Sequence, residues 1–344
     1  MITFYSPGVP SAQFTEADLC AQLSGTAVWI DIIAPTADEE RALEQALGID
    51  IPTREEMQAI ELSSRLYEEN GILFMTGTVL TKAGTTAPES SAVTFILAGE
   101  KLVTLRYAEP AAFAAFRARR EANLQRYCTS SDFMAGLIDA IVERAADILE
   151  AVGASMDKIS LRVFEPATPA VRINGGRNPL SRTQRGEARK ARQRDFVEVL
   201  TQIGGVSDLV SRVRESLVSF VRLIAFFREA RKDDPGAHDA LLHLQTVTGD
   251  ITSLSDHATF LSGKVNFLLD ATLGMINNEQ NAIIKILSVA ALVFLPPTLV
   301  AGIYGMNFEV MPELKWAQGY PFALALMIIA GVLPYMFFRR KGWL

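Results

Sequence analysis

The sequence predicts an α+β protein with an N-terminal mixed α/β domain in the cytoplasm, a long helical stalk and two transmembrane helices at its C-terminal end. Three observations predict this architecture. The mean hydropathy of +0.19 is high for a protein whose whole surface meets water. Two stretches, 286–308 and 316–338, carry no charged residue, and each has about 23 residues, enough to cross a bilayer core of about 30 Å. No proline interrupts the chain between Ala237 and Pro296, so one long helix is expected there.

Residues 1–130 are expected to form the mixed α/β domain, because short runs of β-forming residues alternate with turn residues such as Asn70-Gly71. Strands so close in sequence favour an antiparallel or mixed sheet. Thr36, followed by a first turn rich in Asp and Glu, predicts a capped helix. The expected strands are 27–33, 63–69, 72–80, 92–98 and 101–107, and the expected helices are 37–47 and 54–61. No glycine-rich nucleotide motif follows any of these strands.

Residues 131–236 are expected to form a helical hairpin. Apolar residues at spacings of three and four, from Phe133 to Ile159, predict a first helix that Pro166 ends. The segment 166–186 is rich in proline, glycine and arginine, and we interpret it as a mobile, solvated loop. Its basic charge leaves phosphate binding as the alternative. A second long helix is predicted from 187 to 232, before a turn at 233–236.

Residues 237–303 are expected to form a stalk helix whose upper part, about 284–304, is the first transmembrane helix. Six polar or small residues and one isoleucine follow one another here at intervals of three and four, so they share one helix face: Asn266, Asp270, Gly274, Asn277, Asn281, Ile284 and Ser288. Inside a membrane, an outward polar face would meet lipid. We expect this face to turn inward, towards a water-filled axis shared with symmetry-related copies. Asp270 and Asn281 would then form rings of oxygen ligands that suit a hard cation.

The remaining residues predict the membrane topology. A short acidic loop, 305–319, separates the first span from the second transmembrane helix, 320–338, and a basic tail follows at 339–344. The positive-inside rule places this tail, and therefore both termini, in the cytoplasm of a multi-pass membrane protein. The N-terminus has no signal-peptide pattern. Buried core helices are the alternative, but the first apolar stretch lacks the polar face of a soluble helix.

Composition and motifs disfavour several other functions. Lys and Arg number 33 against 39 Asp and Glu, and the net charge of −6 lacks the basic footprint of a nucleic-acid-binding protein. Cys20 and Cys128 lie far apart, and the three histidines have no zinc-site spacing. Zinc chemistry and Cys-His catalysis are therefore unsupported. We expect neither an enzymatic activity nor a resident cofactor.

A short motif, Tyr304-Gly305-Met306-Asn307-Phe308, directly follows the first apolar stretch. It closely resembles the CorA family of magnesium transporters, whose hallmark is a Gly-Met-Asn loop between two C-terminal membrane helices. The similarity is strongest from Val265 onwards, is closest to the enterobacterial branch, and extends weakly to 28–31 and 53–56. It implies a homopentamer in the cell inner membrane that conducts hydrated Mg²⁺ inward down its gradient without ATP. Such proteins also pass Co²⁺ and in some cases Ni²⁺, and they close at high cytosolic Mg²⁺, so Mg²⁺ would be both substrate and regulator.

The resemblance, together with the polar face, assigns roles to individual residues. The expected selectivity filter is the motif itself, in which Gly305 and Asn307 would present oxygens to the hydrated ion. Glu309 and Glu313 would attract cations outside. The expected pore lining is Asp270, which would also contact the ion, with Asn277, Asn281, Ile284, Ser288, Leu295 and Thr298. The intracellular Mg²⁺ sensor has no one-to-one match; its candidates are Asp250, Asp256 and Glu89, with ordinary solvated carboxylates as the alternative.

Two other functions stay open from the sequence. The first is a zinc transporter on the same scaffold, although relatives that transport zinc carry Gly-Ile-Asn where this chain has Met306 in the middle position. The second is a cytoplasmic enzyme anchored by a membrane hairpin. Such an enzyme would need a catalytic constellation within residues 1–130, where neither a nucleophile–base pair nor a nucleotide loop is found.

Overall fold

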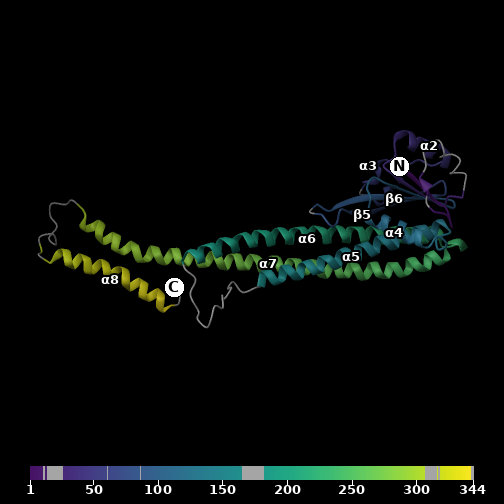
Figure 1. Ribbon diagram of the computed structural model, residues 1–344. Coiled ribbons are helices and arrows are strands. Elements are labelled where there is room, and N and C mark those ends of the chain that lie inside the picture. Colours follow the sequence, from purple (N-terminus) through teal and green to yellow (C-terminus); the bar gives the residue numbers. More distant parts are fainter. Residues whose placement is uncertain are drawn as a thin grey trace. The chain divides into compact units, whose positions relative to one another are not determined.

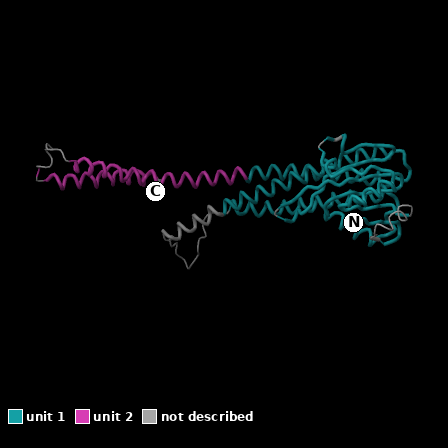
Figure 2. The backbone as a smooth tube through the Cα atoms, turned by 90° about the horizontal axis from the view of Figure 1, so that it is seen from above, with its two compact units in different colours: residues 1–268 teal, residues 269–344 magenta. Residues whose placement is uncertain are grey.

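The computed structural model describes residues 1–10, 12–13, 26–59, 61–85, 87–164, 182–306, 316 and 318–341 (Figure 1). These residues form two compact units, Met1–Leu268 and Leu269–Leu344 (Figure 2). The boundary falls inside one long helix, α7 (His238–Tyr304). The described chain therefore has the predicted α+β class, with a mixed sheet, a long helix and two apolar C-terminal helices.

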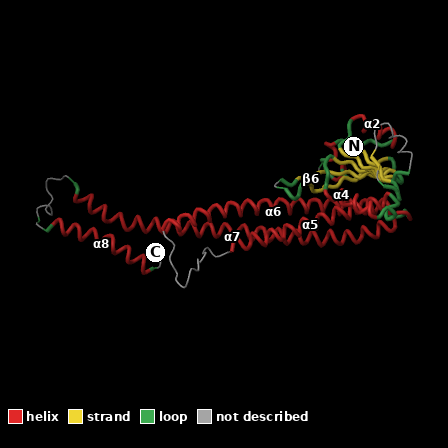
Figure 3. Tube along the Cα trace, viewed as in Figure 1, coloured by secondary structure: helices red, strands yellow, loops and turns green. Residues whose placement is uncertain are grey.

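Unit 1 contains a seven-stranded mixed sheet in the order β2-β1-β3-β7-β6-β5-β4. Figure 3 shows its strands in yellow. Only β3 and β7 pair in parallel among these strands; the other neighbours are antiparallel. The prediction of a mixed sheet is thus confirmed, and the two N-terminal strands are additions to it. The strands are β1 (Ile2–Tyr5), β2 (Ala12–Gln13), β3 (Trp29–Ile33), β4 (Leu66–Glu69), β5 (Ile72–Thr81), β6 (Glu89–Ala98) and β7 (Lys101–Arg106).

Two short helices cover one face of the sheet (Figure 1). Helix α2 (Ala37–Leu47) begins as predicted, because Thr36 and Glu39 form a reciprocal capping box. Helix α3 (Arg54–Met57) has the same kind of cap but ends four residues earlier than predicted. The 3₁₀ helix η2 (Leu62–Ser64) then leads into β4. Ile30, Ile32 and Val103 from the sheet pack with Leu43 of α2 in this part of the core.

Longer helices cover the opposite face: α4 (Ala111–Ala122), α5 (Ser130–Phe164) and α6 (Arg182–Arg231). Helix α6 lies close against β5, because an added Cβ at Gly77 would come within 2.8 Å of the Phe220 ring. The Ser216 hydroxyl donates to the Thr78 carbonyl (2.6 Å), and the Thr78 N–H donates to Ser219 Oγ (3.0 Å). Two α6 hydroxyls therefore satisfy backbone groups of β5 and fix α6 on the sheet.

The start of α6 corrects one prediction. The segment 166–186 was expected to be a loop, but residues 182–186 already belong to α6. Arg182, Gln184 and Arg185 are good helix formers, and one internal glycine, Gly186, costs a helix only about 1 kcal/mol. The rest of the expected loop lies outside the described residues. At its other end α6 gives way to the 3₁₀ helix η3 (Pro235–Ala237), which Asp234 caps before α7 begins.

A buried charged cluster lies at the centre of the sheet. Asp31 and Arg106 are fully buried and form a two-pronged ion pair, with Nε to Oδ1 at 3.0 Å and Nη2 to Oδ2 at 2.8 Å. Thr104 donates to Asp31 Oδ1 (2.8 Å) and accepts from the Trp29 indole (3.0 Å). The surroundings are dry: burial, followed by the nearby Asp31 carboxylate, raises the pKa of Tyr5 to about 12. The cluster explains why Trp29 and Asp31 occur together in this strand.

We expect the substitution Asp31→Ala to destabilise unit 1 by about 3–5 kcal/mol, because it leaves the Arg106 guanidinium buried without its counter-charge. The measurement is urea unfolding of the full-length protein, followed by the fluorescence of Trp29. Trp29 is fully buried and stacks on Tyr5 with ring centroids 4.0 Å apart, so its emission reports this region.

Asp38→Ala is the matched control for this experiment. Asp38 also pairs with an arginine, Arg41, but both side chains are exposed. Its loss should cost less than about 1 kcal/mol. In both variants Trp316 and Trp343 are replaced by Phe so that only Trp29 emits. Equal stabilities for the Asp31→Ala and Asp38→Ala proteins would contradict the role given to the buried pair.

Within unit 1, α7 uses one face for packing. Its buried residues recur at intervals of three, four and seven: Ala240, Leu244, Val247, Ile251, Ala258, Leu261, Val265 and Leu268. This stripe faces the other elements of the unit. The exposed side carries hydroxyls, among them Thr252 and Thr259, which bond back to their own helix.

Unit 2 consists of the rest of α7 and helix α8 (Gly319–Arg340), both long and apolar enough to cross a membrane. Only 6% of the apolar window of each helix is buried. The two helices touch at a small residue: an added Cβ on Gly331 of α8 would lie 3.5 Å from Pro297 Cγ and from the Val293 carbonyl oxygen. Close approach at glycine is typical of helices packed in a membrane.

Candidate functional site

The predicted polar face is continuous along α7. Asp270, Asn277, Asn281 and Ser288 are all exposed in the single chain, and so is Thr298. The two apolar members of the set are exposed as well, Ile284 at 59% and Leu295 at 65%. The described residues of one chain therefore leave the whole stripe uncovered.

Helix α8 covers a different side of α7. Val289 is only 3% exposed, and Val293 and Pro297, one and two turns further on, contact Gly331. At about 100° per residue, this contact side points about 150° away from Ser288 and Leu295. The polar stripe and the α8 contact are therefore on nearly opposite sides of α7. Sequence analysis did not identify the α8 contact; its signal is the spacing of four between Val289, Val293 and Pro297 together with the small residue in α8.

Thr298 contributes an acceptor to the stripe. Its hydroxyl donates to carbonyl oxygens of its own helix, Leu295 O at 2.8 Å and Phe294 O at 3.1 Å. Because its hydrogen is used in this way, the oxygen lone pairs remain for an external partner. This arrangement suits a cation or a water molecule in its hydration shell.

The upper end of α7 points its carbonyl groups towards the predicted filter. The helix ends at Tyr304, the Gly305 N–H donates to Ala301 O (3.0 Å), and the Met306 N–H donates to Ile303 O (3.2 Å). A Cβ on Gly305 would lie 3.0 Å from Ala301 O, so a larger residue would crowd this helix end. A helix C-terminus carries a partial negative charge, which attracts cations. Asn307, Phe308, Glu309 and Glu313 lie outside the described residues.

The candidate sensor residues are not brought together within one chain. Asp250 and Asp256 are both exposed on α7, but six residues separate them, about 120° around the helix. Glu89 lies on β6 and forms an ion pair with Lys82 (2.8 Å). Among the described residues, no three His, Cys, Asp or Glu side chains form a potential metal cluster. A sensor made of these residues would need groups from more than one chain.

Comparisons with known proteins identify the family of the chain. The sequence model of the family described as CorA-like Mg²⁺ transporter protein matches residues 24–175 and 181–340. The chain is 35% identical to the magnesium transport protein CorA of Salmonella typhimurium over 319 residues, 92% of each chain. The same identity and coverage are found for the magnesium transport protein CorA of Escherichia coli K12.

A solved structure shows the same fold. The complete structure of the CorA magnesium transporter from Methanocaldococcus jannaschii matches with a TM-score of 0.72 at 17% identity, over all of this chain and 99% of that one. The likeness includes the sheet, the long helices and both apolar C-terminal helices. The fold, the family match and the identity over most of both chains lead to one conclusion: this chain belongs to the CorA family, whose members are Mg²⁺ transporters and not enzymes.

Proposed function

We propose that this protein is a homopentameric channel for the passive influx of hydrated Mg²⁺. The observation that carries the proposal is the uncovered polar stripe of α7, which lies on the side of the helix away from α8. A stripe of amides and hydroxyls inside a membrane is stable only if it faces water or other protein. Copies arranged around an axis provide that environment, with α8 outside against lipid.

The residues of the stripe suit a hydrated divalent cation. Mg²⁺ loses its water shell reluctantly, so uncharged oxygens that hydrogen-bond its waters can select it without dehydration. Asn277, Asn281 and Ser288 would supply such oxygens, and Asp270 would add a ring of carboxylates at the inner end. At the outer end, Gly305 and Asn307 would form the filter, and Glu309 would raise the local cation concentration.

Closure would use the apolar members of the stripe. Rings of Ile284 and Leu295 can expel water when the helices approach one another, which stops conduction without a plug. Mg²⁺ in the cytoplasm would favour the closed state through carboxylates that neighbouring copies bring together, with Asp250, Asp256 and Glu89 as the candidates. Co²⁺ and Ni²⁺, with similar hydration shells, would pass as secondary ions.

The charge distribution supports a location in the cell inner membrane with both termini in the cytoplasm. Arg339 and Arg340 end α8, and Lys341 follows. At the other end of α8, the Trp316 and Phe322 rings pack at a tilt, with ring centroids 5.7 Å apart, and Tyr320 is exposed. Basic residues at the cytoplasmic end of a span and aromatic residues at the interface are typical of this orientation.

The proposal is tested with purified protein in liposomes. We expect a Mg²⁺ gradient alone, without ATP, to drive influx that a magnesium-sensitive dye reports inside the vesicles. Co²⁺ should enter more slowly, and Zn²⁺ should not compete. Light scattering in detergent should give five times the 37.6 kDa chain mass. A stable monomer, or flux only when ATP or a proton gradient is supplied, would contradict the proposal, and preferential Zn²⁺ flux would favour a zinc transporter.

A further inference from the structure

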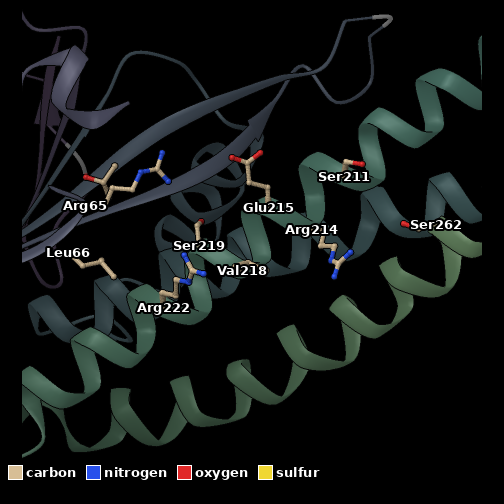
Figure 4. Close-up of a pocket in the computed structure, with 10 residues that line it drawn as sticks. Arg65, Leu66, Ser211, Arg214, Glu215, Val218, Ser219, Arg222 and Ser262 are labelled. Carbon is tan, nitrogen blue, oxygen red and sulfur yellow. The ribbon is translucent and has the colours of Figure 1, made fainter. Parts of the chain in front are cut away.

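A cleft with both polar and apolar walls lies within unit 1, between the sheet, α6 and the first part of α7 (Figure 4). Its volume is about 480 Å³, which is in the range of small-molecule sites. Arg65 and Glu215 also line a second cavity of about 440 Å³. The polar side chains that line the cleft include Arg65, Thr76, Arg214, Glu215, Arg222 and Ser262.

Three arginines give this cleft a positive charge in a chain whose net charge is −6. Arg65 comes from the link between η2 and β4, while Arg214 and Arg222 project from α6 (Figure 4). Glu215 is the one acidic residue in the lining, so the three arginines exceed it by two charges. None of the three arginines forms an ion pair with a described carboxylate.

The sequence of α6 explains why Arg214 and Arg222 form no ion pair within their own helix. Arg212, in the same helix, pairs with Asp208 four positions away (2.8 Å). Arg214 and Arg222 have no Asp or Glu at those positions. Both side chains are exposed.

The walls of the cleft are fixed before any ligand binds. Arg65 is half buried; its Nε donates to Ala59 O (2.7 Å) and its Nη1 donates to Thr78 Oγ1 (3.2 Å). These bonds orient the guanidinium and leave its Nη2 without a hydrogen-bond partner among the described residues. The hydroxyls of Ser216 and Ser219 hold α6 on the same strand residue, Thr78. A site that is rigid beforehand loses less entropy when it binds.

We propose that this cleft binds a phosphorylated small molecule that carries at least two negative charges, such as a nucleoside triphosphate or pyrophosphate. The guanidinium group matches phosphate oxygens in paired hydrogen bonds, and three of them suit more than one phosphate. A single carboxylate from a neighbouring copy would fill little of the 480 Å³ and would pair with one arginine only.

The position of the cleft gives binding a structural consequence. Ser262 belongs to the stalk part of α7, Arg214 and Arg222 belong to α6, and Arg65 belongs to the sheet side. A polyphosphate held by all of them would tie these three parts of unit 1 together. The inference does not depend on the transport activity, because binding is measured without flux.

The test is calorimetric titration of the full-length protein in detergent, in a buffer freed of divalent metals. The probes are pyrophosphate and ATP, with AMP as the single-phosphate comparison and adenosine as the uncharged one. We expect pyrophosphate and ATP to bind, AMP to bind more weakly and adenosine not to bind. The double variant Arg214→Ala/Arg222→Ala should weaken ATP and pyrophosphate at least about tenfold, since two charge-assisted hydrogen-bonding groups are removed.

Two further variants sharpen the result. Glu215→Gln should tighten pyrophosphate binding several-fold, because it removes a like charge from the cleft; general damage to the fold cannot produce this gain. Arg228→Ala removes an exposed arginine of α6 outside the cleft and should leave affinity unchanged. Should the double variant fail to fold, the single variants Arg214→Gln and Arg222→Gln replace it.

Three outcomes would overturn the inference. The first is the absence of binding to the unmodified protein. The second is an equal loss in Arg228→Ala and in the double variant, which would indicate nonspecific attraction of anions. The third is dissociation of the oligomer in the double variant without any anion binding, which would identify the cleft as a contact between copies of the chain.

Discussion

Replacing Asn307 by alanine should reduce Mg²⁺ uptake to background, a loss of more than about tenfold, while the oligomer remains folded. In the proposed pentamer this change removes one amide oxygen from every copy at the filter. Each hydrogen bond contributes about 0.5–1.5 kcal/mol, and a difference of 1.4 kcal/mol is tenfold, so the loss of a whole ring exceeds the effect of any single contact. The measurement is growth and Mg²⁺ uptake in a strain that lacks its own magnesium transporters.

Asn278→Ala is the matched control for this experiment. Asn278 is an exposed asparagine of α7, like Asn277, but it lies about 100° around the helix from its neighbour and off the polar stripe. Its substitution should leave uptake near that of the unmodified protein. Light scattering and thermal unfolding establish that both variants assemble. Normal uptake in the Asn307→Ala protein, or an equal loss in both variants, would show that the filter has been wrongly assigned.

Local signals predicted most of the fold. Thr36 and the acidic turn after it gave the start of α2, and runs of β-forming residues in 92–98 and 101–107 gave two central strands within a few residues. These features act over a few residues, so the sequence contains them in full. In contrast β1 is only four residues long, and it is a strand because it pairs with β3 and β2. Such pairing depends on a distant segment and has no local signal.

Helix α4 was missed for a different reason. It has a readable signal, since Pro110 precedes a run rich in alanine and arginine, both good helix formers. The helix is held by aromatic contacts: the Phe116 ring packs edge-on against Trp29 (5.5 Å) and Tyr127 (5.0 Å). An added Cβ at Gly136 would come within 2.6 Å of both the Phe116 ring and the Tyr127 ring. Only the tertiary structure reveals that this glycine makes room for them.

The candidate site, like the fold, was predictable only where the signal is local. Spacings of three and four placed Asp270, Asn277 and Asn281 on one face of α7, because helix geometry fixes that relation. Which side α8 covers did not follow, since hydropathy treats all faces of an apolar helix alike. The close approach of Gly331 to Val293 and Pro297 settles it. The cleft lined by Arg65 and Arg222 could not be predicted either. The two residues are distant in sequence, and they line one cleft only because α6 packs on β5.

The orientation of α7 predicts a large difference in water accessibility among three consecutive residues. Leu287, Ser288 and Val289 point in directions about 100° apart, so they should face lipid, the aqueous axis and α8 respectively. In the single chain Leu287 is 70% exposed and Val289 is 3% exposed. Exposure in the single chain alone does not tell lipid from water. Three cysteine variants, one at each position, can make that distinction.

The variants are made in a background in which Cys20 and Cys128, the two natural cysteines, are replaced by serine. Each is treated in membranes with a charged methanethiosulfonate reagent, which needs a thiolate in water. Ser288→Cys should react at least about tenfold faster than Leu287→Cys and Val289→Cys, because ionising a thiol in lipid or in a packed contact carries a large desolvation penalty. Faster reaction at Leu287→Cys than at Ser288→Cys would mean that the polar stripe does not face the pore. Fast reaction at Val289→Cys would mean that α8 does not cover α7 on that side. The polar stripe would then have no geometric reason to face the axis.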